Sequence, residues 1–94
     1  MTKVVNSGDV VLSKAGRDKG KYFLVVTVDG KIATIVDGRN RKVNFPKKKN
    51  IKHLEIVSAA KLKHLAEKIL KGEPVGNEKV YRAVKAEKQK IQED

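Results

Sequence analysis

The sequence predicts a mainly β protein with an α appendage, in which a small five-stranded barrel is followed by two C-terminal helices. Two patterns predict this class. Short runs of β-forming residues, separated by tight-turn signals, occupy residues 1–57, and an apolar period of about 3.6 residues follows in residues 58–94. A chain of 94 residues has room for one small domain with a modest core. We therefore expect a barrel over residues 1–57 and a helical extension over residues 58–94 that packs on the barrel or on a partner.

Five short strands account for the β-forming runs. We expect them at residues 9–13, 22–28, 32–36, 43–45 and 54–57. Asp29-Gly30 accepts the positive φ angles of a type I′ turn and joins the second strand to the third, and Pro46 ends the fourth. The second run has no polar alternation, so both of its faces should be covered. Short strands joined by tight turns favour a closed barrel, because closure removes exposed edges.

Two helices are expected after the last strand. Ser58 is a suitable N-cap for the first, Gly72 follows its end, and Asn77 can cap the second. The apolar residues at helical spacing are Leu62, Leu65, Ala66, Ile69 and Leu70 in the first helix, and Val80, Tyr81, Val84 and Ile91 in the second. Residues 88–94 hold one apolar residue and are expected to fray. Lysines beside the first stripe resemble those of a membrane-surface helix, but so short a stripe favours packing on the barrel or a protein over membrane contact.

The chain is strongly basic. It has 22 Lys and Arg against 11 Asp and Glu, a formal net charge of +11 at pH 7. The surplus lies mainly in the predicted barrel, which carries +8, whereas residues 58–94 carry +3. A solubility surface normally mixes both signs. A surplus this dense attracts polyanions, because neutralised phosphates release their condensed counterions. Nucleic acid is therefore the expected partner.

The loop Gly16-Arg17-Asp18-Lys19-Gly20-Lys21 is the first candidate site. A phosphate-binding P-loop needs four residues between its glycines and a Ser or Thr after its Lys, whereas three residues lie between these glycines and Tyr22 follows the Lys. The loop also leads into a predicted strand and not into a helix, which argues against nucleotide binding of that kind. Its glycines permit a tight path that presents three cations together.

With Gly8-Asp9-Val10-Val11 before it and an apolar strand after it, this loop resembles the KOW motif. The pattern continues through Ile35-Val36-Asp37-Gly38 and Asn50-Ile51-Lys52-His53-Leu54-Glu55. Over residues 7–57 the chain resembles the large-subunit ribosomal family L-fourteen-e, above all its short bacterial KOW-domain relatives. The resemblance implies a small SH3-like five-stranded barrel that binds RNA, ribosomal RNA above all, in translation or in association with the ribosome. It also allows a ribosomal or transcription protein as a partner.

The segment 39–53 is the second candidate site. It holds seven Lys and Arg and three Asn without one acid. Arg forks grip phosphates or stack on unpaired bases, and Lys supplies point charges. A merely solvated loop is the alternative, which fifteen residues without a balancing acid disfavour. The residues expected to contact RNA are Lys14, Arg17, Lys19, Gly20, Lys21, Arg39, Asn40, Arg41, Lys42, Lys47, Lys48, Lys49, Asn50, Lys52 and His53.

Aromatic residues are few, so recognition is expected to rest on phosphates and on RNA shape. Phe23 and Phe45 are predicted to be core residues. Tyr22, beside the Gly-Lys pair of the first loop, is the best candidate for stacking on a base, and the alternative, which its place in a strand favours, is a half-buried position.

Catalysis is not expected. His53 and His64 lie in different elements, no Cys is present, and two histidines without neighbouring carboxylates do not make a zinc site. We therefore predict a cytoplasmic protein that is not an enzyme and uses no cofactor and no metal. Two other functions remain open. One is a protein-interaction module that docks a transcription or ribosome-associated factor through the barrel and the Leu/Ile helix face, and the other is non-specific DNA binding.

Overall fold

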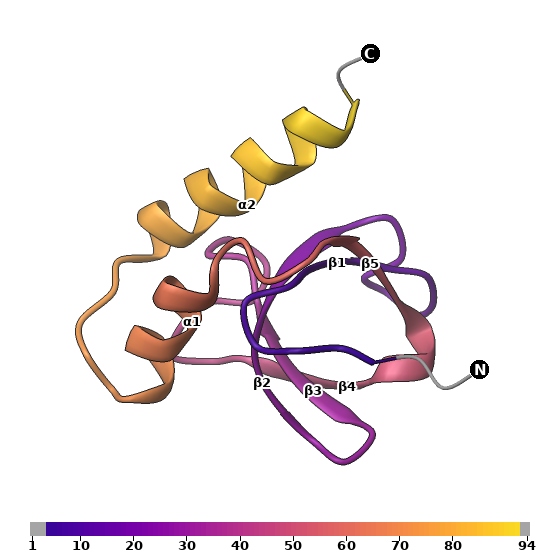
Figure 1. Ribbon diagram of the computed structural model, residues 1–94, viewed down its shortest axis with the longest axis horizontal. Coiled ribbons are helices and arrows are strands. Elements are labelled where there is room, and N and C mark those ends of the chain that lie inside the picture. Colours follow the sequence, from indigo (N-terminus) through magenta and orange to yellow (C-terminus); the bar gives the residue numbers. More distant parts are fainter. Residues whose placement is uncertain (1–3, 93–94) are drawn as a thin grey trace.

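The computed structural model describes residues 4–92 and confirms the mainly β class with two helices at the C-terminal end. The elements in chain order are β1 (Val10–Ser13), β2 (Tyr22–Asp29), β3 (Ile32–Val36), β4 (Lys47–Asn50), the short 3-10 helix η1 (Ile51–His53), β5 (Leu54–Ser58), α1 (Lys63–Leu70) and α2 (Asn77–Gln92). Figure 1 shows the strands curling around a common centre, with the two helices along one side of them.

The five strands form one antiparallel sheet in the order β4-β3-β2-β1-β5. The β2–β3 hairpin turns one residue later than predicted, at Gly30-Lys31, because Asp29 still pairs with Ile32. Gly30 has a φ of +61° and Asp29 does not have a positive φ, so the type I′ turn predicted at Asp29-Gly30 is wrong. The pairing of β2 with β3 shifts between Val25 and Thr27, and such irregularities increase the bend and twist of a strand. This pairing leaves β4 and β5 at the two edges of the sheet, so closure into a barrel stays a prediction.

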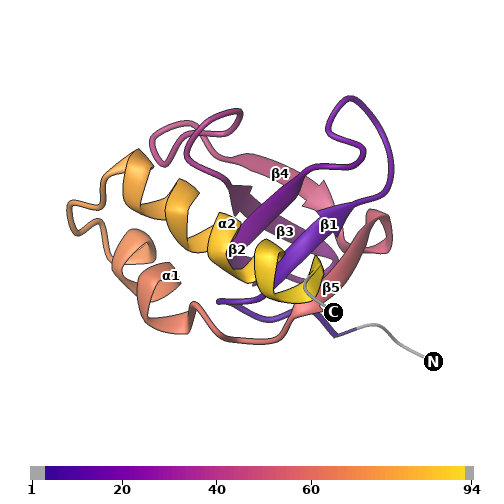
Figure 2. The same cartoon turned by 90° about the horizontal axis from the view of Figure 1, so that it is seen from above.

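Strand β2 divides its side chains between two apolar cores. Phe23 and Val25 lie in a cluster on the inner face of the curled sheet, with Val11, Ala33, Ile35 and Leu54. Leu24 and Val26 point the other way, because successive side chains of a strand alternate between faces, and they pack with Leu65, Ala66, Val80 and Val84 of the two helices. The helices therefore cover the outer face of β2 (Figure 2), and the prediction that both faces of this run are covered is confirmed.

The predicted fourth strand is wrong. Val43 and Asn44 form a turn, and β4 begins only after Pro46. The backbone N–H of Val43 donates to Oδ1 of Asn77 at 2.8 Å, which ties this segment to the start of α2 instead of to the sheet. Phe45 is 78% exposed, so its prediction as a core residue is also wrong.

The predicted N-cap of the first helix is wrong as well. Ser58 ends β5, and its hydroxyl donates to Oε1 of Glu87 in α2 at 2.9 Å. The chain turns instead through Ala60, whose N–H donates to the buried carboxylate of Asp9 at 2.7 Å, and α1 starts at Lys63. The predicted position of Gly72 after α1 is confirmed. Asn77 lies at the start of α2 as expected, but its Oδ1 accepts from the N–H of Val43, so its side chain joins the helix to the turn at Val43 and Asn44. Fraying was predicted for residues 88–94, but residues 88–92 are helical and end α2, while residues 93–94 lie outside the described residues.

Candidate nucleic-acid interface

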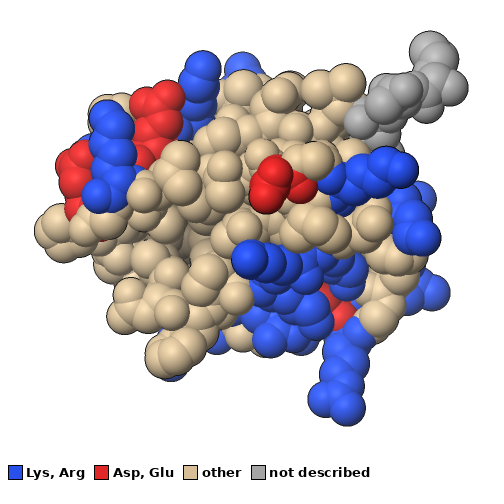
Figure 3. Space-filling view, turned by 90° about the horizontal axis from the view of Figure 1, so that it is seen from below, with Lys and Arg blue, Asp and Glu red and all other residues tan. Residues whose placement is uncertain are grey.

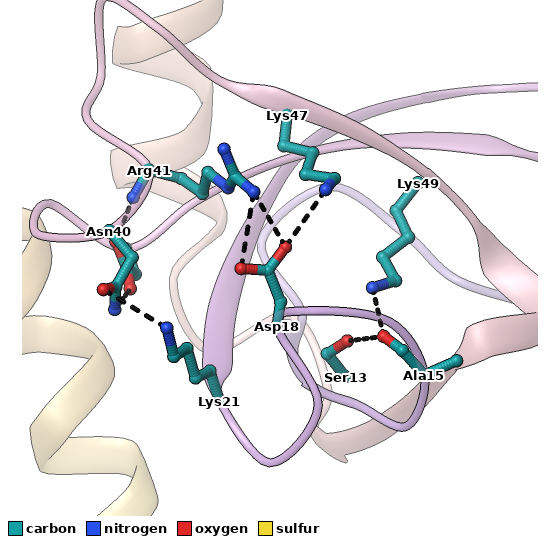
Figure 4. A network of polar contacts seen from close by, with 9 residues as sticks. Ser13, Ala15, Asp18, Lys21, Asn40, Arg41, Lys47 and Lys49 are labelled. Carbon is teal, nitrogen blue, oxygen red and sulfur yellow. Dashed lines mark hydrogen bonds and ion pairs between the residues drawn. The ribbon is translucent and has the colours of Figure 1, made fainter.

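The loop between β1 and β2 runs beside the segment that leads from the turn after β3 to η1. Five contacts join them in opposite chain order: Lys14 N–H to His53 O at 2.8 Å, Lys49 Nζ to Ala15 O at 2.6 Å, Asp18 to Lys47, Asp18 to Arg41, and Lys21 Nζ to Asn40 Oδ1 at 3.4 Å. Figure 4 shows the side-chain contacts of this series. The two predicted sites therefore form one surface, which we call the basic strip and define as residues 14–21 and 39–53.

Asp18 lies at the middle of the basic strip and is 3% exposed. Its Oδ2 is 3.1 Å from Nη2 of Arg41 and 3.3 Å from Nζ of Lys47. Burial alone would raise the pKa of Asp18, but hydrogen bonds from Arg41 and Lys47 and their positive charges outweigh it and hold the pKa below its ordinary value. The carboxylate is therefore a fixed counter-ion that draws both cations toward the loop.

Lys49 and Asn50 make hydrogen bonds within the basic strip and so stabilise its structure. Lys49 is only 9% exposed, and its ammonium donates to the carbonyl oxygen of Ala15. Oδ1 of Asn50 accepts a hydrogen bond from the N–H of Lys52 at 3.0 Å and so caps η1. Because the ammonium of Lys49 is directed inward, we remove this residue from the predicted RNA contacts.

The remaining cations of the basic strip face solvent or make weak surface pairs. Those that are exposed and form no ion pair within residues 4–92 are Arg17, Lys19, Lys21, Lys42, Lys48 and Lys52. Lys14 pairs with Glu55 at 2.9 Å, but both side chains are at least half exposed, and such a pair is readily exchanged for a phosphate. On the face shown in Figure 3, Lys and Arg side chains gather on one side with few acids between them.

The backbone of the first loop is open to close approach. Gly20 is exposed with a φ of +88°, and a Cβ added there would meet nothing within 4 Å. The glycine is therefore required by the backbone conformation and not by crowding. Nothing in the described fold would separate this part of the loop from a bound phosphate chain.

The turn after β3 places Arg39 and Asn40 against α2. The carboxylate of Asp37 accepts hydrogen bonds from the N–H groups of Arg39 and Arg41 at 2.9 and 2.7 Å. Gly38 has a φ of +81°, and a Cβ there would overlap the carbonyl of Asn77, so only glycine lets this turn lie on the first turn of α2.

Helix α2 contributes residues that the sequence prediction did not include. The guanidinium carbon of Arg39 lies 3.8 Å from the ring centroid of Tyr81, and Nη2 of Arg39 is 3.3 Å from Oε1 of Glu78. Hydrogen bonds from Arg82 and Arg39 lower the pKa of Glu78 below its ordinary value. Tyr81, Lys85 and Lys88 also line one wall of a groove whose other walls are the first loop and the turn after β3. These residues are spaced at i, i+4 and i+7, which places them on one face of a helix, and this spacing is the sequence pattern from which the wall could have been predicted.

The described residues hold no group of three or more His, Cys, Asp or Glu side chains that could bind a metal ion. His53 lies in η1 and His64 in α1. Within the same residues, no helix combines the length and the apolar composition that crossing a bilayer requires.

Comparison with protein-family models gave no match for this chain, and comparison with the curated proteins gave none either.

Proposed function

We propose that this protein is a non-catalytic RNA-binding module that grips structured RNA, ribosomal RNA above all, through phosphate contacts along the basic strip, in translation or in association with the ribosome. The main support for RNA binding is the series of contacts that runs from Lys14–His53 to Lys21–Asn40. These contacts join two basic segments into one surface. Cations on a single surface can meet successive phosphates of one backbone.

Electrostatics supports this proposal. Each phosphate neutralised by Lys or Arg releases condensed counterions, so a row of exposed cations without internal partners favours nucleic acid over most other ligands. The choice of RNA over DNA follows from the resemblance to the KOW motif, and the chemistry of the strip is common to both.

A protein-interaction module is less well supported. That function would require the apolar face of α1 to be open to a partner. Leu65 is 8% exposed and Ala66 is buried, while Leu62 and Ile69 pack against the same cluster under the helices. Leu70 alone of this stripe is exposed, at 58%.

Binding measured as a function of salt tests the proposal. With a structured ribosomal RNA fragment, log K should fall linearly with log salt, by about 0.7–0.9 per phosphate contacted. Replacing Lys42, Lys48 and Lys52 together with Gln should flatten that slope by about 2–3 units if each meets one phosphate.

The matched control is the replacement of Lys61, Lys63 and Lys71 with Gln, which removes the same charge from exposed positions in and beside α1. The control should leave the slope nearly unchanged. Equal slopes for the two triple variants would contradict the placement of the interface, and equal affinity for a DNA duplex of the same sequence would contradict the choice of RNA.

A further inference from the structure

A groove of about 220 Å³ lies between the end of the first loop, the turn after β3, and α2. Its walls carry Lys21 from the loop, Asn40 from the turn, and Lys85 and Lys88 from α2. This volume is below the ~300–1,000 Å³ of sites for drug-sized ligands. The small volume is therefore suited to one small planar group, and the three lysines are suited to negative charge next to that group.

Two tyrosines flank the groove, one from each side. Tyr22 begins β2, and Nζ of Lys88 lies 5.0 Å from the centroid of its ring. Tyr81 lies in α2, with Nζ of Lys85 at 5.9 Å from its ring centroid. Both rings are half-buried, and the guanidinium of Arg39, which does not line the groove, already lies 3.8 Å from the ring centroid of Tyr81. On the groove side, the lysine ammonium groups bind the rings less strongly than a nucleic-acid base stacks on an aromatic ring. A base can therefore displace them, and the displaced ammonium groups remain close enough to reach its phosphates.

Asn40 is held in a fixed orientation at the edge of the groove. Its Nδ2 donates to Oδ2 of Asp37 at 2.9 Å, and its Oδ1 accepts from Nζ of Lys21 at 3.4 Å. An amide has two N–H donors and two acceptor lone pairs, so one donor and one acceptor remain in a defined plane. Paired donors and acceptors of this kind match the edge of a base.

We propose that this groove receives a single unpaired nucleotide of the RNA bound along the basic strip. The proposal rests on the proposed function and adds what kind of RNA is preferred: a helix that carries a bulged or looped-out nucleotide. The base stacks on Tyr81, with Tyr22 on the other side of the groove, its edge meets the amide of Asn40, and the flanking phosphates meet Lys21, Lys85 and Lys88. Sequence-specific RNA recognition commonly uses unstacked bases, because the deep major groove of an RNA duplex is closed to side chains.

The test compares two hairpin RNAs. One has a fully paired stem, and the other has the same stem with a single bulged, unpaired nucleotide. The wild-type protein should bind the bulged hairpin about tenfold more tightly, the scale expected for one base stacked on an aromatic ring. A 4-thiouridine at the bulge should photo-crosslink to Tyr22, Tyr81 or a neighbour in the groove, and the same label in the paired stem should not. Because this arm uses the unaltered chain, it does not depend on any variant folding.

Variants assign the preference to the groove. Tyr81→Leu should remove the tenfold gain for the bulged hairpin, and Tyr81→Phe should retain it because the ring remains. Phe45→Ala is the matched control, because Phe45 is an exposed aromatic in the basic strip that does not line the groove. It should leave the gain unchanged.

The outcomes separate this inference from the proposed function. Equal, salt-dependent binding of both hairpins would overturn the nucleotide site and leave RNA binding in place. A crosslink from the bulge to Phe45 alone, or a gain that Tyr81→Leu leaves intact, would also overturn it. Failure of the wild-type protein to bind either hairpin at low salt would overturn both proposals.

Discussion

Asp18 carries the charge that repels RNA, yet it lies at the centre of the surface that we propose binds it. Its carboxylate holds Arg41 and Lys47 together from two separate parts of the chain. Nη2 of Arg41 donates to Asp18, and Nε is buried without a partner among the described residues, so of the five N–H groups of the guanidinium those on Nη1 are left for a phosphate. The residue therefore lowers the net charge of the strip by one and fixes the geometry of the cations around it.

Replacing Asp18 with Asn should destabilise the fold by about 1–3 kcal/mol at pH 7, because two cations lose a buried, charged hydrogen-bond partner. Urea unfolding measures the change. Asp29→Asn, at an exposed end of β2, is the control and should change the free energy of unfolding by less than about 0.5 kcal/mol. Equal losses in the two variants would contradict the role given to Asp18.

The lowered pKa of Asp18 predicts a dependence of stability on pH. The unfolded state binds the proton more readily, so the stabilisation is complete above the unfolded pKa of about 3.9 and is lost as the pH falls through the lower folded value. The free energy of unfolding should therefore decrease below about pH 4 more steeply in the wild type than in Asp18→Asn. Parallel curves for the two proteins would contradict this assignment.

At the scale of single residues, the sequence indicated the composition of the site but not the direction of each side chain. Positions 47, 48 and 49 are all lysine, so the sequence does not distinguish them. In the structure β4 pairs with β3, and Lys49 is the buried residue of the three. The carbonyl of Ala15, which receives the ammonium of Lys49, is 34 positions away in the chain. No local pattern encodes that contact, whereas the glycines at positions 20 and 38 mark tight turns directly.

Among the elements, β2 and α1 show how the helices complete the fold. Strand β2 is apolar on both faces, and α1 and α2 cover the face that the curled sheet leaves outside. This arrangement was predictable because an unbroken apolar run requires two covered faces. The fourth strand was not, because Val43 and Phe45 read as a β pattern while the contact of Val43 with Asn77 turns the chain away from the sheet.

Leu65→Ala should destabilise the protein by about 2–4 kcal/mol, because it opens a cavity between α1 and β2. Leu70→Ala, at the exposed end of the same helix, is the control and should cost less than about 1 kcal/mol. Chemical denaturation followed by circular dichroism measures both. A small effect of Leu65→Ala would contradict the packing of the helix on the sheet as a stabilising element.

For the whole molecule, the uneven distribution of charge is the main functional signal. The surplus of +11 that the composition shows becomes, in the fold, a strip of loops and one edge strand with α2 beside it. Both basic segments were predicted from the sequence. That they form one surface depends on contacts between residues far apart in the chain, which the sequence does not indicate. The wall provided by α2 was missed because its cations are spaced along a helix that also carries acids.

A lysine acetylation footprint tests the central claim most directly. The full-length protein is labelled with and without a structured ribosomal RNA fragment, and mass spectrometry gives the rate at each lysine. We predict that RNA protects Lys19, Lys42, Lys48 and Lys52 and leaves Lys61, Lys63 and Lys71 unchanged, while Lys49 reacts slowly in both states because its ammonium is buried. Protection of the α1 lysines with an unprotected basic strip would contradict the account.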